Sequence, residues 1–169
     1  MRVAVTGTPG TGKTTATGRL DTALDVAHLN DLVGTEGLYD GVDADRGSKI
    51  VDVDAVRDHF AGREDVLVES HLAHRLDDLD AVVVLRCAPE TLATRLQDRG
   101  DSPEKAAENA DSEALAIILS EAVRGHGADA VYEIDTTDRS PDAVAAAIQA
   151  VLDGDREPSA GTVDYTDYV

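Results

Sequence analysis

The feature that most constrains this chain is residues 7–14, GTPGTGKT, which fit the pattern G-x-x-x-x-G-K-[ST]. The apolar segment before it, residues 2–6, predicts a strand, and residues 14–24 predict a helix. Glycines at this spacing let successive backbone N–H groups point inward, at the N-terminus of a helix, and surround an anion. The sequence therefore predicts a strand, a phosphate-binding loop and a helix in direct succession. The alternative interpretation is a glycine-rich turn that binds nothing.

The side chains of this loop suit a nucleoside triphosphate. Lys13 can neutralise the β- and γ-phosphates, and the hydroxyl of Thr14 can bind the Mg²⁺ that accompanies them. We therefore expect ATP as a ligand and Mg²⁺ as the cofactor carried with it. The predicted ATP-binding residues are Gly10, Gly12, Lys13, Thr14, Thr15 and Arg99.

Short apolar runs alternate with helical patterns along the rest of the chain, which is typical of a parallel sheet with crossover helices. Further strands are predicted at residues 26–29, 66–68, 81–85 and 131–134. Further helices are predicted at residues 54–60, 89–98, 104–124 and 141–152. Residues 30–50 are rich in glycine and aspartate and predict an irregular segment, which in a small domain is often functional. The predicted fold is an α/β P-loop NTPase, a three-layer sandwich around a five-stranded parallel sheet.

The 169 residues suffice for one domain, which we place at residues 1–154. Residues 155–169 are acidic, have almost no apolar pattern and predict a disordered tail. No run approaches the roughly 20 apolar residues of a membrane span, and the N-terminus does not resemble a signal peptide. The single cysteine, Cys87, excludes a disulfide framework and a cysteine-based zinc site. We therefore expect a cytoplasmic protein.

The charge balance is strongly negative, because 34 Asp and Glu residues against 15 Lys and Arg residues give a formal net charge of −19. Such a surface repels nucleic-acid phosphates, so we expect no direct DNA contact, and a protein partner would have to be basic. An acidic composition with few lysines and aromatic residues is also typical of proteins from halophiles, in which molar salt screens the repulsion. An ordinary acidic protein is the alternative.

Glu69 and His71 follow the predicted strand 66–68 and are candidates for catalysis. A carboxylate at a strand end can hold Mg²⁺ through its waters. An imidazole beside it can position or deprotonate a water or an acceptor hydroxyl. The alternative for His71 is a histidine that only makes hydrogen bonds at the end of a strand. Two other histidines, His59 and His74, are expected on the surface.

Arg95 and Arg99 lie four residues apart in a predicted helix and therefore share one face. Two guanidinium groups on one face can clamp a phosphoryl group while negative charge spreads over its oxygens. The alternative is a salt bridge with the neighbouring Asp98 or Asp101. We expect both arginines to be catalytic.

The length and the motifs favour a small phosphoryl-transfer enzyme. The chain is too short for large ring-forming ATPases, and it lacks the N-K-x-D motif that reads guanine. Further motifs are LYDG at 38–41, ESH at 69–71, VLR at 84–86, RL at 95–96, RG at 99–100, and Lys105 followed by EN at 108–109. Together with residues 6–15, they resemble the archaeal and eukaryotic nuclear-type adenylate kinases, small NTPases linked to maturation of the small ribosomal subunit. The resemblance covers nearly all of residues 1–154.

The resemblance implies a division of the site. Residues 28–51 would form the monophosphate-binding segment, and residues 98–108 a short lid over ATP. It further implies AMP binding by Asp31, Tyr39, Asp40 and Gly41, metal binding by Thr14 and Glu69, and catalysis by Lys13, Glu69, His71, Arg95 and Arg99. Relatives tend to carry an arginine after the equivalent of Asp31-Leu32, where this chain has Val33-Gly34, so that Arg46 or Arg75 would have to compensate.

Two functions follow from the resemblance. The first is a nucleoside monophosphate kinase of broad specificity that catalyses ATP + AMP ⇌ 2 ADP and also hydrolyses ATP. The second is a switch-like ATPase with little kinase activity that acts in ribosome assembly. The implied partner is a basic protein of the small ribosomal subunit, and the chain is expected to be a monomer. A nucleotide-binding module without catalysis is disfavoured, because the loop, the acid and both arginines are present.

Overall fold

The computed structural model describes residues 1–169, and its centre is a parallel sheet of five strands in the order β2-β5-β1-β6-β7. The strands are β1 (Arg2–Thr6), β2 (Asp25–His28), β5 (Val66–Glu69), β6 (Ala81–Arg86) and β7 (Val131–Asp135). The first strand lies in the middle of the sheet and pairs with β5 and β6. The loop that follows β1 therefore opens at the centre of the carboxyl edge, where α/β sheets bind their ligands.

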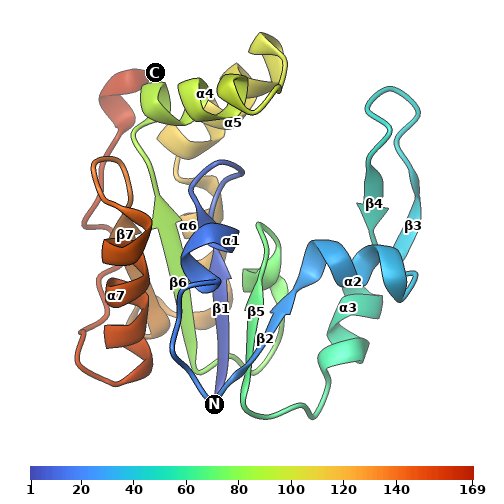
Figure 1. Ribbon diagram of the computed structural model, residues 1–169, viewed down its shortest axis with the longest axis vertical. Helices are drawn as coiled ribbons and strands as arrows, with labels where there is room; N and C mark the ends of the chain where they lie inside the picture. The colour runs from blue at the N-terminus through green and yellow to red at the C-terminus, as the bar shows by residue number, and fades with distance from the viewer.

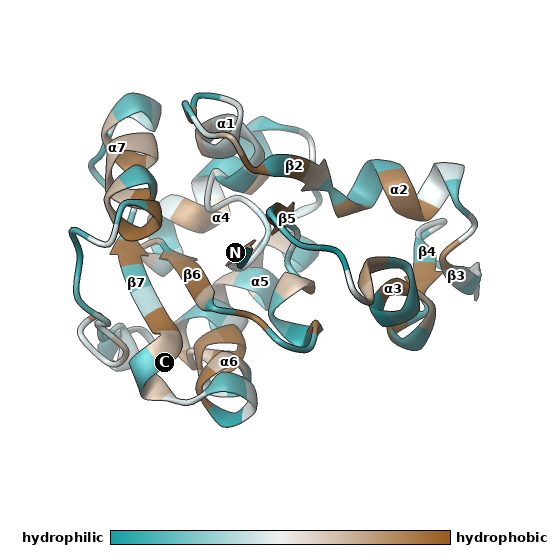
Figure 2. Ribbon diagram, turned by 90° about the horizontal axis from the view of Figure 1, so that it is seen from below, coloured by the Kyte–Doolittle hydropathy of each residue, from teal (hydrophilic) through white to brown (hydrophobic).

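Helices cover both faces of the sheet, as Figure 2 shows. One face packs against α1 (Lys13–Thr17) and α7 (Pro141–Leu152), and the other against α2 (Leu29–Thr35), α3 (Val53–Phe60) and α6 (Ile117–His126). Alternate strand residues enter opposite cores: Val3 and Val5 face α7, and Ala4 faces α6. The predicted three-layer α/β sandwich is confirmed. None of the helices has both the length and the apolar character needed to cross a membrane.

Two additions extend beyond the carboxyl edge of the sheet (Figure 1). The first is a pair of helices, α4 (Pro89–Asp98) and α5 (Pro103–Ala114), joined over a small core of Cys87, Leu92, Leu96 and Ala106. The second is an antiparallel hairpin of β3 (Tyr39–Val42) and β4 (Lys49–Val51). Short 3₁₀ turns lie at η1 (Ala73–Arg75), η2 (Ala128–Ala130) and η3 (Thr166–Tyr168).

The structure corrects three local predictions. The predicted helix 104–124 is two helices, because Ala116 takes a left-handed conformation (φ 51°, ψ 42°) between α5 and α6. The predicted helix 14–24 ends at Thr17. Residues 30–50, predicted as irregular, form most of α2 and the hairpin. A single helix over residues 104–124 does not form because α5 packs on α4 whereas α6 packs on the sheet. One continuous helix could not make both sets of contacts.

The prediction of a disordered tail at residues 155–169 is wrong. The backbone N–H of Ser159 donates to the carbonyl of Val131 over 3.0 Å, which continues the edge of the sheet. The N–H of Thr162 donates to the buried carboxylate of Glu133 over 2.7 Å, and the hydroxyl of Tyr165 lies 3.3 Å from that of Thr137. These contacts are polar, so they leave no hydrophobic pattern in the sequence.

Candidate active site

The phosphate-binding loop between β1 and α1 is held by close packing at two glycines. A Cβ atom on Gly7 would lie 2.5 Å from the carbonyl oxygen of Leu85, and one on Gly10 would lie 2.9 Å from the side chain of Leu96. Both glycines also have positive φ, +143° and +92°, which side chains rarely tolerate. These two positions therefore require glycine for steric reasons, and the loop is fixed against β6 and α4 before any ligand binds.

Lys13 lies inside the curve of the loop. Its Nζ donates to the carbonyl oxygens of Gly7 and Thr8 over 2.9 and 3.1 Å. Burial lowers the pKa of Lys13 to about 8, against the opposing effect of the carboxylate of Glu69. The buried ammonium of Lys13 donates only to carbonyl oxygens, so the cost of burying its charge is incompletely compensated. An anion bound in the loop would stabilise that charge.

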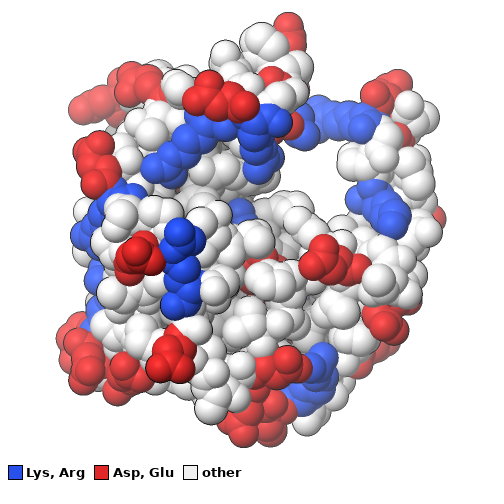
Figure 3. All heavy atoms as spheres, in the orientation of Figure 1, with Lys and Arg blue, Asp and Glu red and all other residues white.

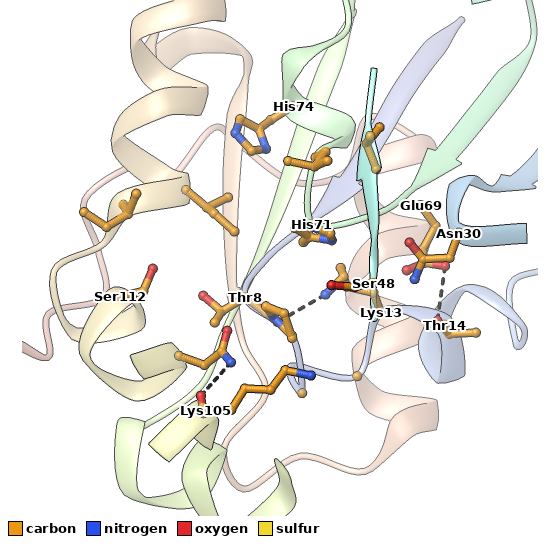
Figure 4. Close-up of a pocket in the computed structure, with 18 of the residues that line it drawn as sticks. Thr8, Lys13, Thr14, Asn30, Ser48, Glu69, His71, His74, Lys105 and Ser112 are labelled. Carbon is orange, nitrogen blue, oxygen red and sulfur yellow. Dashed lines mark hydrogen bonds between the residues drawn. The ribbon is translucent and has the colours of Figure 1, made fainter. Parts of the chain in front are cut away.

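Thr14, Glu69 and His28 meet beside the loop, and Figure 4 shows the first two of them. The hydroxyl of Thr14 donates to Oε2 of Glu69 over 3.2 Å, and Nδ1 of His28 lies 2.8 Å from the same oxygen. A hydroxyl and a carboxylate are hard oxygen donors, and Mg²⁺ commonly takes one or two such protein ligands with phosphate and water completing its shell. The predicted metal-binding pair therefore fits Mg²⁺ in donor type and in proximity.

His28 was missed in the sequence analysis, although a signal for it exists. In the β2–β5 ladder, His28 and Glu69 are opposite each other at the carboxyl ends of their strands. Side chains at the ends of adjacent parallel strands meet at the same edge of a sheet. The order of the strands, which brings β2 beside β5, was needed to identify the pair.

One pocket of about 960 Å³ lies above the carboxyl edge of the sheet. Figure 3 shows its opening as a hollow below α4 and α5 and beside the hairpin, with Lys and Arg side chains along its upper rim. All the residues predicted to bind ATP or to act in catalysis line it: Gly10, Gly12, Lys13, Thr14, Thr15, Glu69, His71, Arg95 and Arg99. The fold thus gathers residues that are up to 89 positions apart, from Gly10 to Arg99.

His71 lies in this pocket just beyond the end of β5. Burial, with a smaller contribution from the charge of Lys13, lowers the pKa of His71 to about 4. The imidazole is therefore neutral near pH 7. In that state one ring nitrogen can accept a hydrogen bond and the other can donate one.

His74 is not the surface residue predicted from the sequence. It is buried, with Nδ1 3.0 Å from the hydroxyl of Thr6 and Nε2 2.8 Å from the carboxylate of Glu121. Burial outweighs the carboxylate and lowers the pKa of His74. These contacts tie the η1 turn to β1 and α6, and His74 lines the pocket three residues after His71.

Both predicted arginines reach the pocket, and both already have partners. Nη2 of Arg95 donates to the carbonyl oxygens of Thr136 and Thr137 over 2.9 and 3.1 Å. Nε of Arg99 donates to Asp101 over 2.8 Å, which is the salt bridge considered as its alternative. The exposed Arg99 pair can exchange its partner for a phosphoryl oxygen at small cost, because surface ion pairs contribute little.

The predicted AMP-binding residues lie beside the pocket and not in it. Asp31 lies in α2, and Tyr39, Asp40 and Gly41 lie in β3, outside the lining. The residues that line this end of the pocket are Asn30, Arg46, Ser48, Lys49 and Val51. The motif Leu38–Gly41 therefore lies in the hairpin that borders the pocket, but β4 and the turn before it supply the residues that line the pocket.

Arg46 and Arg75, considered as substitutes for a missing arginine, are both ion-paired. Nη2 of Arg46 lies 3.1 Å from Glu108 of α5, and Nη2 of Arg75 lies 3.0 Å from Glu121 of α6. The first of these pairs joins the tip of the hairpin to the last residue of the predicted lid, Glu108, which lies on α5. Both residues line the pocket, so this exposed pair bridges the two additions at the edge of the pocket.

A buried ion cluster behind the loop was not predicted. Arg86, at the end of β6, is paired with Glu113 of α5 and Glu133 of β7, and all three side chains are buried. The second carboxylate oxygen of Glu113 accepts a hydrogen bond of 2.6 Å from the hydroxyl of Thr8. The cluster thus connects the phosphate-binding loop to α5. Arg86, Glu113 and Glu133 lie 20 or more positions apart in the sequence, so no local sequence pattern predicts the cluster.

Comparison with known proteins identifies the family to which the chain belongs. The model described as "AAA domain" matches residues 3–116. A protein of Natronomonas pharaonis is 60% identical, with 100% of both chains covered. A protein of Methanothermobacter thermautotrophicus is 39% identical, with 99% of this chain and 98% of its own covered. Both carry the name "Putative adenylate kinase".

Solved structures share the fold at low sequence identity. A deoxyadenosine kinase from M. mycoides with bound dATP has a TM-score of 0.57 at 16% identity, with 90% of this chain and 100% of that chain covered. A shikimate kinase from Bacteroides thetaiotaomicron has a TM-score of 0.53 at 15% identity, with 90% and 98% covered. With its phosphate-binding loop, its parallel sheet and its archaeal relatives, the chain belongs to the AAA-domain family and to the family of the archaeal proteins that carry the name "Putative adenylate kinase".

Proposed function

We propose that the protein is an adenylate kinase that catalyses ATP + AMP ⇌ 2 ADP with Mg²⁺ and also hydrolyses ATP. The observation that carries the proposal is a single pocket with two cationic ends. Lys13 and the loop amides lie at one end, and Arg46 and Lys49 of the hairpin lie at the other. Its volume of about 960 Å³ is at the upper end of the range for small-molecule sites, which suits two nucleotides better than one.

The chain's own residues can perform phosphoryl transfer by positioning and by charge. The loop amides and Lys13 would hold the phosphates of ATP, and Arg95 and Arg99 would stabilise the charge that spreads over the transferred group. Thr14 and Glu69 would hold Mg²⁺, which when bound neutralises charge on the β- and γ-phosphates. The pair Arg46–Glu108 would help to close the mouth, because transfer to an acceptor competes with transfer to water.

A second candidate is an ATPase that works as a switch in assembly of the small ribosomal subunit. Two observations favour it: the neutral imidazole of His71 in the pocket, which can orient a water, and the net charge of −19, which suits a basic protein partner. The two functions use the same loop and differ in the group that accepts the phosphoryl.

A coupled assay of ADP formation separates the two functions. The protein is given ATP and Mg²⁺ alone, and then with each nucleoside monophosphate in turn, at molar KCl because of its acidic surface. We expect AMP to raise the rate of ADP formation by at least about tenfold over ATP alone, since effective positioning of an acceptor is worth several kcal/mol. A rate that is unaffected by every monophosphate would favour the switch and contradict the kinase.

His71→Ala is expected to lower the rate of ATP hydrolysis by about 10²-fold, because general acid–base groups contribute on that scale. The affinity for ATP should change little, since the loop and Lys13 bind the phosphates. His59→Ala is the matched control, because His59 lies on α3, outside the pocket, against the edge of Phe60. Hydrolysis at the wild-type rate in His71→Ala, measured by phosphate release, would remove His71 from the catalytic residues.

A further inference from the structure

We propose that Lys49 binds the phosphate of the acceptor nucleoside monophosphate and thereby determines the KM for that substrate. The inference rests on the proposed kinase function, and it assigns a cation to the end of the pocket opposite the phosphate-binding loop.

Seven Lys and Arg side chains line the pocket: Lys13, Arg46, Lys49, Arg75, Arg95, Arg99 and Lys105. Four of them are paired with carboxylates: Arg46 with Glu108, Arg75 with Glu121, and both Arg99 and Lys105 with Asp101. Two, Lys13 and Arg95, donate to backbone carbonyls. Lys49 alone has neither a carboxylate partner nor a hydrogen bond. In a chain with 34 acidic residues, this ammonium remains available to a ligand.

The position of Lys49 is defined by the hairpin and by α2. Lys49 opens β4 and pairs with Val42 of β3, and its Nζ lies 4.9 Å from the centre of the Tyr39 ring. The same Nζ would be 3.0 Å from a Cβ atom on Gly34. The side chain thus reaches from the hairpin across α2, and the absence of a side chain at position 34 leaves the space that the ammonium uses.

The neighbouring groups suit a phosphate monoester. Lysine provides a compact charge with three donors, and an aromatic face can take one side of the ammonium while the remaining protons point to an anion. Ser48 and Asn30, both labelled in Figure 4, line the same pocket and add neutral donors. The nearest cation of the hairpin, Arg46, is held by Glu108. Lys49 is therefore the hairpin charge that is free to pair with a phosphate dianion.

Steady-state kinetics of Lys49→Met test the proposal, with Lys49→Arg as the conservative variant and Arg139→Met as the matched control. Arg139 is an exposed cation outside the pocket. In Lys49→Met we expect the KM for AMP to rise by about 10- to 100-fold, the range for a lost hydrogen bond to a charged group, with a much smaller change in the KM for ATP. Lys49→Arg should recover most of the affinity, and Arg139→Met should retain both constants.

Binding of AMP, measured by calorimetry in the absence of ATP, separates a failure of this proposal from a failure of the kinase function. If the wild-type protein binds AMP and Lys49→Met does not, the assignment of Lys49 holds even if no phosphoryl transfer is seen. An unchanged KM or Kd for AMP in Lys49→Met would overturn it. An equal rise in the KM for ATP, or a wild-type protein that binds no AMP, would overturn it as well.

Discussion

Replacing Lys13 with methionine is expected to lower kcat/KM for ADP formation by about 10³-fold or more. Methionine keeps the unbranched shape of the side chain but removes the charge that the loop presents to the phosphates. Removing a preorganised donor that stabilises the charge developing in the transition state lowers the rate by about 10²- to 10³-fold. Lys13 contributes both to binding of the phosphates and to phosphoryl transfer. The expected result is loss of both the AMP-dependent and the AMP-independent rate, measured in the coupled assay.

The control for this variant is Arg139→Met, which removes one positive charge from the surface and should retain full activity. Circular dichroism and the melting temperature show whether the Lys13 variant is folded. A folded Lys13→Met protein that keeps more than about a tenth of the wild-type rate would mean that the loop is not the phosphate-binding element.

Arg86→Met is expected to destabilise the protein by about 3–5 kcal/mol, because it leaves the buried carboxylates of Glu113 and Glu133 without their cation. The free energy of unfolding, taken from denaturant titration at constant salt, measures the loss. Arg86 also stacks over the ring of Tyr165, with 5.4 Å from its guanidinium carbon to the ring centre, so the variant should loosen the C-terminal segment.

The matched control is the triple variant Arg86→Met, Glu113→Gln, Glu133→Gln, in which the cluster holds no charge. It should recover much of the stability, since replacing a whole buried ion cluster is often close to neutral. A loss below about 1 kcal/mol in Arg86→Met, or a triple variant less stable than the single one, would contradict this description of the cluster.

The parts of the fold that could be predicted are those that depend on local chemistry. Residues 2–6 and 7–14 are constrained by strand propensity, by glycines with positive φ and by the lysine that the loop requires, and the structure places them as expected. Residues 66–68 and 81–85 were predicted as strands because parallel strands that are buried on both faces are continuous apolar runs, and they lie in β5 and β6. Helix α4 begins at Pro89 and ends at Asp98, as its proline and its apolar spacing indicate.

The parts that could not be predicted depend on contacts between distant residues. The break at Ala116 interrupts an apolar stripe that runs on through both helices, so periodicity alone indicated one helix. The carboxylate of Glu133 orders the C-terminal segment. Arg86 donates to only one of its two oxygens, and the other accepts a hydrogen bond from the backbone of that segment. The motif at 38–41 lies in the hairpin that borders the pocket, but which strand of the hairpin faces the pocket depends on how the hairpin packs.

The central claim is that the loop between β1 and α1 captures the phosphates of a nucleotide. Isothermal titration calorimetry with ATP and Mg²⁺, in molar KCl, tests it most directly. The account predicts one binding site per chain for the wild-type protein and no measurable binding for Lys13→Met. If the wild-type protein bound none of the nucleoside triphosphates tested, this claim would be contradicted, and the kinase assignment would be wrong as well.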